Sequence, residues 1–388
     1  MSLIAPDNAM GVIAALFTIS AAAFLLEKTR VGSQLTGAVI AILGAIIAAN
    51  LGLIPHSAPA YSFVFTYIVP VLIPLFLFKA DLRKILFEAT RTTAAFMLAT
   101  VGTVAGVTVA ALALDLTSLG ANAPIAAAQR EAAIAGLFAS TYIGGSVNYA
   151  ALGELTGLNA DSSFFSAATA ADNLFSAVYL GMLALLPGWT WLSKRFVAHN
   201  EDDVMQADTT DAPPITSMSL CLSVATAMVL VAVGDALVQW WGLSGWRYVT
   251  ITLLALGVAT FMPGLARRLA GSFELGVALS FVFFAAIAAG ADVVAMVEVA
   301  PLLIALVFIL LAIHALVLFT LGSIFKLSLP ELITASNAAV LGATTAPALA
   351  ATKGWHNLVT PGVLVGVLGY ALGTFTGTMI YRYWGLFL

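Results

Sequence analysis

The chain has 388 residues, of which 61% are hydrophobic and only 9% are charged, and its mean hydropathy is +1.04. So little polar surface excludes an ordinary soluble globular domain. Apolar runs long enough to cross a bilayer recur from end to end, and they predict an all-α polytopic membrane protein with the lipid bilayer as its partner. No nucleic-acid partner is expected from a net charge of −4 whose one dense charged stretch is acidic.

Hydrophobicity and turn signals divide the chain into two sets of six elements. The first six are expected near residues 9–27, 33–54, 61–79, 90–115, 131–154 and 162–189. The other six are expected near residues 216–241, 246–264, 272–291, 299–325, 332–351 and 361–385. We therefore predict a first membrane repeat over 1–190, an acidic linker over 191–215 and a second membrane repeat over 216–388. A faint similarity between the apolar stretches 62–82 and 279–296 supports an internal repeat.

The fifth and eleventh elements are interrupted by small and polar residues at matching places. The interruptions read ASTYIGGSVNYAA over 139–151 and ASNAAVLGATTAPA over 335–348. An unwound membrane helix is tolerated only where its freed backbone groups face protein or a water-filled cavity. The two elements are therefore predicted to be discontinuous or re-entrant helices that form a transport site.

The distribution of Lys and Arg tests this interpretation, because these residues collect in cytoplasmic loops. If all the elements cross the membrane, the better orientation places only eight of the fifteen basic residues inside. If the two interrupted elements do not count as simple crossings, the number rises to twelve. The halves then have inverted topology in the cell membrane, with both chain termini outside. The linker is then cytoplasmic and carries the acidic residues Glu201, Asp202, Asp203, Asp208 and Asp211.

Hydroxyl, amide and glycine residues in the two interruptions are the candidate substrate-binding groups. Unwound carbonyls together with hydroxyl and amide oxygens suit a hard cation or a solute that forms hydrogen bonds. The alternative is that small residues only allow close helix packing. The candidates are Thr141, Gly144, Gly145, Ser146 and Asn148 in the first interruption, and Ser336, Asn337, Gly342 and Thr345 in the second.

Asp172 is the strongest candidate for an ion-coupling residue. It is expected near mid-membrane, where an ionised carboxylate is costly unless a cation, a proton or a partner compensates it. We predict that it binds a proton, or Na⁺ as a metal ligand, with Asn173, Ser140 and Thr344 contributing. The alternative is a structural carboxylate that is hydrogen-bonded to hydroxyls such as Ser166 or Thr169.

Other residue types narrow the possible functions. His314 lies in mid-span as either a proton relay or a packing residue. The single cysteine, Cys221, and the scattered histidines offer neither a disulfide framework nor a His/Cys metal site, so no cofactor is expected. We see no catalytic cluster, repeated ion filter or nucleotide-binding loop, so an enzyme, a channel and an ATP-driven pump are not expected.

The stretch Ser140 to Asn148 (STYIGGSVN), followed by Asp172 and Asn173, resembles the YjcL-like (DUF819) family of multi-spanning membrane proteins. That family is similar to the cation:proton antiporters and bile-acid-type sodium symporters. The resemblance implies inverted five-helix repeats, a core domain with two discontinuous helices, and a panel domain that forms a homodimer. In the antiporters a carboxylate–amide or double-carboxylate pair follows the first broken helix, and here Asp172 and Asn173 occupy that place.

The resulting prediction is a secondary active transporter that uses alternating access. Na⁺ or H⁺ would bind at Asp172, and a small organic solute would bind between the interruptions. The positive dipole ends of the half-helices favour an anionic or zwitterionic solute. The alternative function is a monovalent cation:proton antiporter without an organic substrate.

Overall fold

The computed structural model describes residues 2–29, 37–197, 213–243, 246–291 and 293–387, and this part of the chain is α-helical with short 3₁₀ and π turns. The first half contains α1 (Ala9–Glu27), α2 (Gly37–Asn50), α3 (Pro59–Phe63), the π turn η2 (Val64–Ile68), α4 (Val69–Leu77), α5 (Leu82–Glu88), α6 (Thr90–Ala113), η3 (Leu116–Ser118), α7 (Ala127–Gly144), α8 (Ser146–Thr156), η4 (Leu158–Ala160), α9 (Ser162–Leu185), η5 (Leu186–Gly188) and α10 (Thr190–Ser193). The second half contains α11 (Ser217–Trp241), α12 (Arg247–Phe261), α13 (Pro263–Arg268), α14 (Ser272–Ala289), α15 (Val293–Ile324), α16 (Leu329–Leu341), α17 (Thr345–Thr352), η8 (His356–Leu358), α18 (Val359–Arg382) and η9 (Trp384–Leu386).

The helices follow the apolar elements expected from the sequence. Among the described residues, 8 helical runs are long and apolar enough to span a membrane, and they are α1, α3 to α4, α6, α9, α11, α14, α15 and α18. The shorter apolar helices α2 and α12, and the pairs α7–α8 and α16–α17, account for the remaining expected elements. The largest boundary difference is at α15, which begins at Val293 instead of near residue 299. The five acidic residues of the predicted linker lie within 198–212, outside the described residues.

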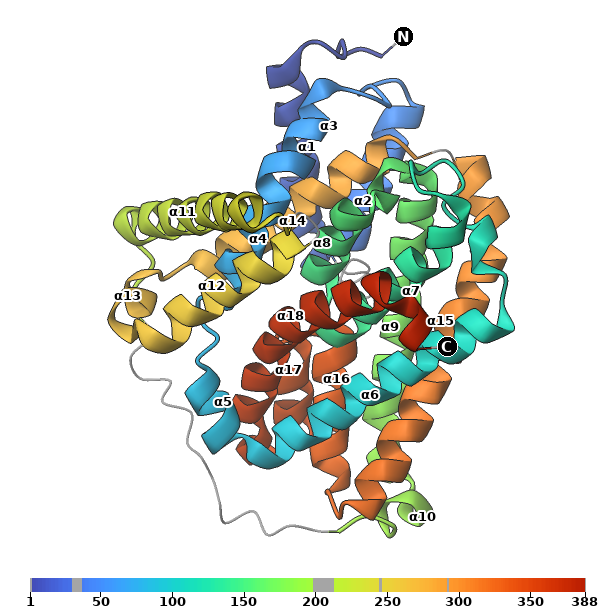
Figure 1. Ribbon diagram of the computed structural model, residues 1–388, viewed down its shortest axis with the longest axis vertical. Coiled ribbons are helices and arrows are strands. Elements are labelled where there is room, and N and C mark those ends of the chain that lie inside the picture. Colours follow the sequence, from blue (N-terminus) through green and yellow to red (C-terminus); the bar gives the residue numbers. More distant parts are fainter. Residues whose placement is uncertain (1, 30–36, 198–212, 244–245, 292, 388) are drawn as a thin grey trace.

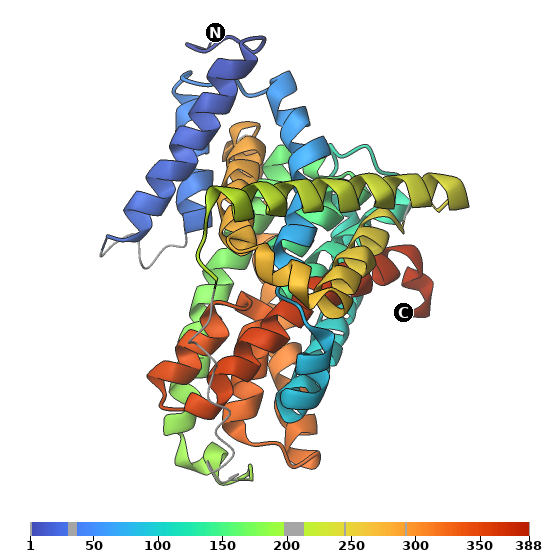
Figure 2. The same cartoon turned by 90° about the vertical axis from the view of Figure 1, so that its left-hand side faces the viewer.

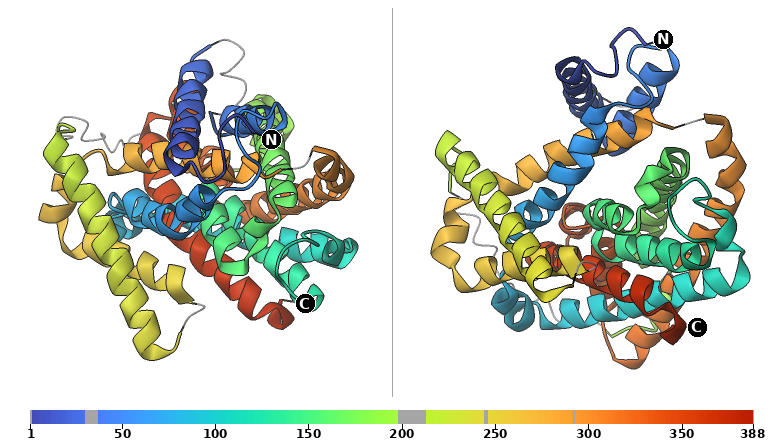
Figure 3. Two further views of the ribbon diagram at one scale, coloured as in Figure 1. Left: turned by 90° about the horizontal axis from the view of Figure 1, so that it is seen from above. Right: turned by 45° about the horizontal axis from the view of Figure 1, so that its top comes forward.

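Helices of the two halves pack against each other in a reciprocal pattern (Figure 1). From the first half, α1 and α2 pack on α14, and from the second half, α11 and α12 pack on α4. The helices α4 and α14 contact each other, as do α6 and α15. In Figure 2, α1 lies at the left and α11 crosses the front of the molecule, and the left view of Figure 3 shows α11 at the edge. Helices α4, α6, α14 and α15 are therefore each packed against helices of the other half.

Both predicted interruptions are present as breaks at a single glycine. Gly145 separates α7 from α8 with φ 76° and ψ −170°. Gly342 ends α16 with φ 94° and ψ −173°. A positive φ with ψ near 180° is a region that essentially only glycine occupies. The two breaks therefore share one backbone conformation, and the sequence supplies at both places the residue that conformation requires.

One helix, α18, packs against both breaks. A Cβ atom at Gly366 would overlap the Ala343 backbone beside the second break, and one at Gly369 would lie 2.5 Å from the Ile143 carbonyl oxygen beside the first. These two glycines are one helical turn apart, so the breaks contact the same short length of α18. Small residues permit such close approach of membrane helices. The two interruptions are thus brought together across α18.

Substituting Gly144 tests this close packing of α7 against α18. In Gly144→Ala the new methyl group would overlap the Gly369 carbonyl oxygen, so we expect a loss of about 1–3 kcal/mol in the free energy of unfolding. Gly181→Ala is the matched control, because a Cβ atom there meets nothing within 4 Å. Thermal unfolding of the purified protein in detergent compares the two variants. Equal unfolding temperatures would contradict the α7–α18 contact.

Candidate functional site

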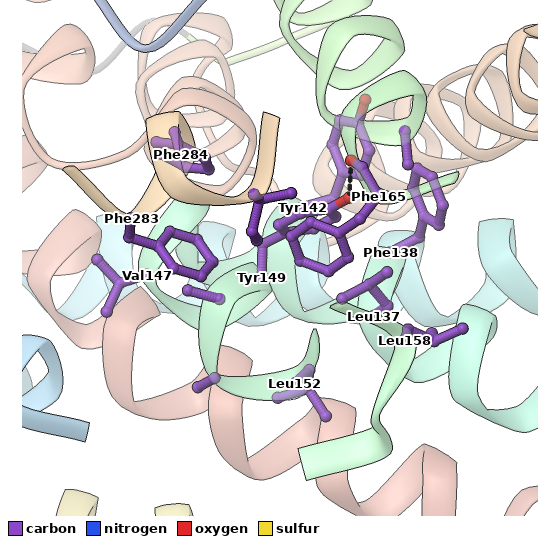
Figure 4. Packing of buried hydrophobic residues seen from close by; sticks show 14 of the residues in the cluster. Leu137, Phe138, Tyr142, Val147, Tyr149, Leu152, Leu158, Phe165, Phe283 and Phe284 are labelled. Carbon is purple, nitrogen blue, oxygen red and sulfur yellow. Dashed lines mark hydrogen bonds between the residues drawn. The ribbon is translucent and has the colours of Figure 1, made fainter. Parts of the chain in front are cut away.

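Large buried aromatic side chains surround the first break (Figure 4). The Tyr149 and Phe165 ring centroids lie 4.2 Å apart, and Phe165 makes an edge contact of 6.3 Å with Phe283 of α14. The Tyr149 hydroxyl donates a hydrogen bond of 2.8 Å to the Phe165 carbonyl oxygen. These contacts join α8, α9 and α14, so a buried apolar wall lines the first break.

Asp172 lies beside this wall, in the middle of the continuous helix α9. Its Oδ2 atom accepts a hydrogen bond of 3.4 Å from the Thr141 hydroxyl on the broken helix α7. Its Oδ1 atom is buried and has no hydrogen-bond partner among the described residues. The described part of the chain also contains no ion pair to Asp172. The carboxylate therefore faces the first break with one oxygen unsatisfied.

Tyr142 is a further polar neighbour of Asp172 that was not among the predicted site residues. Its side chain is fully buried, and its hydroxyl lies near the Asp172 carboxylate and the Ser176 side chain without reaching good hydrogen-bonding geometry to either. A buried polar atom without a partner is costly, and an ion or a water molecule is a usual explanation. The available signal was an aromatic hydroxyl two positions before the glycine pair.

The hydroxyls considered as structural partners of Asp172 do not bond to it. Thr169 donates 2.8 Å to the Phe165 carbonyl oxygen, and the buried Ser166 hydroxyl has no partner among the described residues. The Asn173 amide donates 2.8 Å to the Thr169 carbonyl on its own helix. Among the described residues, Asp172 is approached by the Thr141 and Tyr142 hydroxyls, and its Oδ1 atom has no partner in good hydrogen-bonding geometry.

Two predicted site residues of the first interruption face α18. The Ser140 hydroxyl donates 2.7 Å to the Leu137 carbonyl within α7. The Asn148 amide nitrogen donates to the carbonyl oxygens of Gly369 (3.3 Å) and Tyr370 (2.8 Å). Both side chains are fully buried. The Asn148 bonds hold the first break against α18, Ser140 packs beside Gly377 of that helix, and neither side chain is hydrogen-bonded to Asp172.

In the second interruption, Asn337 and Thr345 bridge their own break. The Asn337 amide nitrogen donates 3.1 Å to the Thr345 carbonyl, and the Thr345 hydroxyl donates 2.9 Å to the Asn337 side-chain oxygen. Asn337 lies five positions before Gly342, and Thr345 lies three positions after it. Ser140 and Asn148 have the same spacing around Gly145. Equivalent positions therefore carry the polar residues that hold each break.

Ser146 and Thr344 are the exposed members of the predicted set. Ser146 begins α8, and Thr344 lies directly before α17. A Cβ atom at Gly145 would meet nothing within 4 Å, and one at Gly342 would meet only the Tyr370 hydroxyl, at 3.9 Å. Each break thus has one open side beside a helix N-terminus, where free N–H groups favour an anion. Ser336 differs, because it is fully buried and hydrogen-bonded to Tyr179 and His314.

The sequence comparisons place the chain among known membrane proteins. Residues 14–384 match the family described as "Protein of unknown function (DUF819)". The chain belongs to this family. It is also 32% identical over 388 residues to the "Uncharacterized membrane protein YjcL" of Bacillus subtilis (strain 168), with 94% of this chain and 93% of that protein covered. The resemblance to the YjcL-like family is confirmed, and this DUF819 protein is a multi-pass membrane protein.

Proposed function

We propose that this DUF819 protein is a secondary active transporter that couples the movement of Na⁺ or H⁺ to that of a small organic solute. The observation that carries the proposal is the Asp172 carboxylate, which is bonded to a broken helix through Thr141 and has one unsatisfied buried oxygen. An ionisable residue inside a membrane is expensive and usually marks an ion or proton pathway. A coupling cation would supply the missing partner.

The proposed ion site contains Asp172, the Thr141 hydroxyl and the Tyr142 hydroxyl. These groups are an anionic oxygen and two neutral oxygens, which suit a small hard cation. Asn173 stays in the proposal as the next residue of α9, although its amide nitrogen is bonded within the helix. Ser140 and Thr344 remain predicted contributors, with Ser140 turned toward α18 and Thr344 at the second break.

The proposed solute site lies between the open sides of the two breaks, where Ser146 and Thr344 are accessible. The N-termini of α8 and α17 carry partial positive charge there, which favours an anionic or zwitterionic solute. Binding of a cation at Asp172 would offset the negative charge of the carboxylate close to this site. Ion binding would therefore strengthen the binding of an anionic solute, and this is the electrostatic basis of symport.

We infer that the two halves are inverted repeats and that they form two moving bodies. The reciprocal packing of α1 and α2 on α14, and of α11 and α12 on α4, supports the repeats. The core would contain α6 to α9 and α15 to α18, and the panel would contain α1 to α4 and α11 to α14. Aromatic contacts such as Phe76–Tyr370 and Phe165–Phe283 lie where these bodies meet. Alternating access would move the core against the panel.

The panel is also the proposed dimer surface. The candidate spans with the smallest buried share are α1, with 22%, and α11, with 28%. A second copy on the panel would leave the core free to move. The proposed localisation is the cell membrane, with the linker cytoplasmic and both termini outside.

Reconstituted proteoliposomes test the proposed transport. Radiolabelled carboxylates and amino acids would be offered with and without an inward Na⁺ gradient or pH gradient, while an internal pH-sensitive dye is recorded. We expect at least one solute to accumulate only when an ion gradient is present. A dye response to Na⁺ without accumulation of any solute would indicate cation:proton antiport and contradict symport.

A further inference from the structure

A chain of buried hydrogen bonds connects the two broken helices through His314 of α15. On one side, His314 Nδ1 lies 2.9 Å from the Thr103 hydroxyl of α6, which is 3.1 Å from the Tyr142 carbonyl oxygen. On the other side, His314 Nε2 lies 2.9 Å from the Ser336 hydroxyl of α16, which is 2.8 Å from the Tyr179 hydroxyl. The side chains of Thr103, His314 and Ser336 are fully buried.

The acceptor at one end sets the direction of this chain. The Tyr142 carbonyl can only accept, so the Thr103 hydroxyl donates to it and must accept from His314. His314 therefore carries its proton on Nδ1, and its bare Nε2 accepts from Ser336. The Ser336 oxygen then accepts from the Tyr179 hydroxyl. Each donor is used once along this chain, so a neutral histidine satisfies it, and the Ala99 backbone of α6 is a further polar neighbour of the imidazole.

The first end of the chain is a consequence of the helix break. Tyr142 lies in the last turn of α7, where carbonyl groups lose their intrahelical donors. In hydrocarbon such a group needs another partner, and the Thr103 hydroxyl supplies it. Tyr142 also follows Thr141, the residue that donates to Asp172. A shift of this turn on ion binding would thus move an acceptor that belongs to the His314 chain.

The other end of the chain reaches the second broken helix and returns to α9. Ser336 lies six residues before the Gly342 break. Tyr179 lies seven residues, or about two helical turns, after Asp172 on α9. The imidazole is held between these elements, because its ring makes an edge contact with the Tyr179 ring at 5.9 Å. Close approach of Gly102 to the His314 backbone also fixes α6 against α15.

We propose that His314 is a positioning residue that transmits neutralisation of Asp172 to the second broken helix. This inference rests on the proposed function, because it assumes that a cation or a proton compensates Asp172. The Tyr142 turn responds to the change at Asp172, and Thr103, His314 and Ser336 pass the displacement to α16. The solute-binding region at Gly342 and Thr344 is then ordered only when the ion site is filled. A network with a purely structural role would stabilise the fold equally in both states.

The proton position on His314 is a direct prediction. In the ¹⁵N spectrum of protein labelled at histidine ring nitrogens, His314 is assigned by the signal that His314→Gln removes. We expect a protonated Nδ1 and an unprotonated Nε2. A proton on Nε2 would contradict the chain, because Ser336 could then not donate to that nitrogen.

Hydrogen exchange read by mass spectrometry tests the transmission itself. Asp172 is neutralised in two ways, by adding Na⁺ in place of an equal concentration of a bulky organic cation, and by the substitution Asp172→Asn, which imitates a protonated carboxylate. In the otherwise wild-type protein we expect at least one of the two to slow amide exchange in both α7–α8 and α16–α17. Coupling between protein sites is typically about 5- to 150-fold, so we expect a slowing of at least about fivefold.

The same comparison is then made in Tyr179→Phe, Ser336→Ala and His314→Gln. Thr334→Val is the matched control, because it removes a hydroxyl from α16 that has no partner among the described residues. We expect the three network variants to keep the slowing in α7–α8 and lose it in α16–α17, whereas Thr334→Val keeps both. Tyr179→Phe preserves the ring, so it keeps the test valid if His314→Gln does not fold. If α16–α17 still slows in Tyr179→Phe and Ser336→Ala, the role of His314 is overturned, and the proposed ion site is unaffected. If neither added Na⁺ nor Asp172→Asn changes amide exchange in α7–α8 of the otherwise wild-type protein, the proposed ion site is overturned, and the inference with it.

Discussion

The substitution Asp172→Asn is expected to abolish ion-dependent transport while the protein remains folded. An amide cannot offer the negative charge that a coupling cation or proton requires, and the remaining polar neighbours, Thr141 and Tyr142, are neutral. The unpaired Oδ1 atom makes the ionised carboxylate costly in the absence of an ion. Neutralising it should therefore raise the free energy of unfolding in Na⁺-free buffer by about 1–3 kcal/mol. Uptake in proteoliposomes and thermal unfolding measure the two effects.

The control for this prediction is Asp161→Asn at the start of the same helix. Asp161 accepts hydrogen bonds of 3.1 Å from the backbone N–H groups of Phe164 and Asn122, so its charge has satisfied partners at a helix N-terminus. We expect it to lose about 0.5–1 kcal/mol of stability, because a negative charge at that end is favourable, and to retain transport. If Asp172→Asn still shows ion-dependent transport at the wild-type level, Asp172 is not part of the ion site. A loss of stability in Asp172→Asn would favour a structural carboxylate.

Alanine in place of the glycine at either break is expected to lower both stability and the rate of transport. Gly145 and Gly342 adopt a conformation that costs a residue with a Cβ atom about 1–3 kcal/mol. At Gly145 the new methyl group meets nothing within 4 Å, so the whole effect arises from the backbone. A change in the break would displace Ser146 or Thr344, and we expect at least about a tenfold lower uptake rate, equivalent to about 1.4 kcal/mol.

Gly242→Ala separates hinge geometry from backbone strain in general. Gly242 ends α11 with φ 67° and ψ 25°, and a Cβ atom there also meets nothing within 4 Å. This variant should lose about 1 kcal/mol of stability and transport at the wild-type rate. The comparison is made at equal amounts of reconstituted protein. If Gly145→Ala and Gly242→Ala transport equally well, the breaks do not have the proposed role.

The sequence was sufficient to predict the membrane elements and the places of the two breaks, because length, hydropathy and small polar residues are local signals. Asp172 was found because a carboxylate stands out in an apolar run. The partners of Ser140, Asn148 and His314 were not predictable in the same way. In a membrane helix both the lipid-facing and the buried side are apolar, so the pattern that distinguishes faces in soluble helices is weak.

A signal for one of these contacts was nevertheless available. Glycines recur along one side of α18 at intervals of three or four residues, and such a row of small residues indicates close helix packing. The row contains Gly362, Gly366, Gly369, Gly373 and Gly377. It would have predicted that α18 packs closely against another helix, although not that α7 and both breaks contact it. Which helices contact α18 depends on tertiary packing, and this information is not contained in any single segment of sequence.

Direct ion binding to the purified protein tests the central claim most sharply. Binding of radioactive Na⁺ and release of protons on Na⁺ addition would be measured in parallel for the wild-type protein, Asp172→Asn and Asp161→Asn. We predict saturable Na⁺ binding or stoichiometric proton uptake and release in the wild type and in Asp161→Asn, and neither in Asp172→Asn. Equal ion binding in Asp172→Asn, or no exchange of Na⁺ or protons in the wild type, would contradict an ion-coupled transporter with its cation site at Asp172.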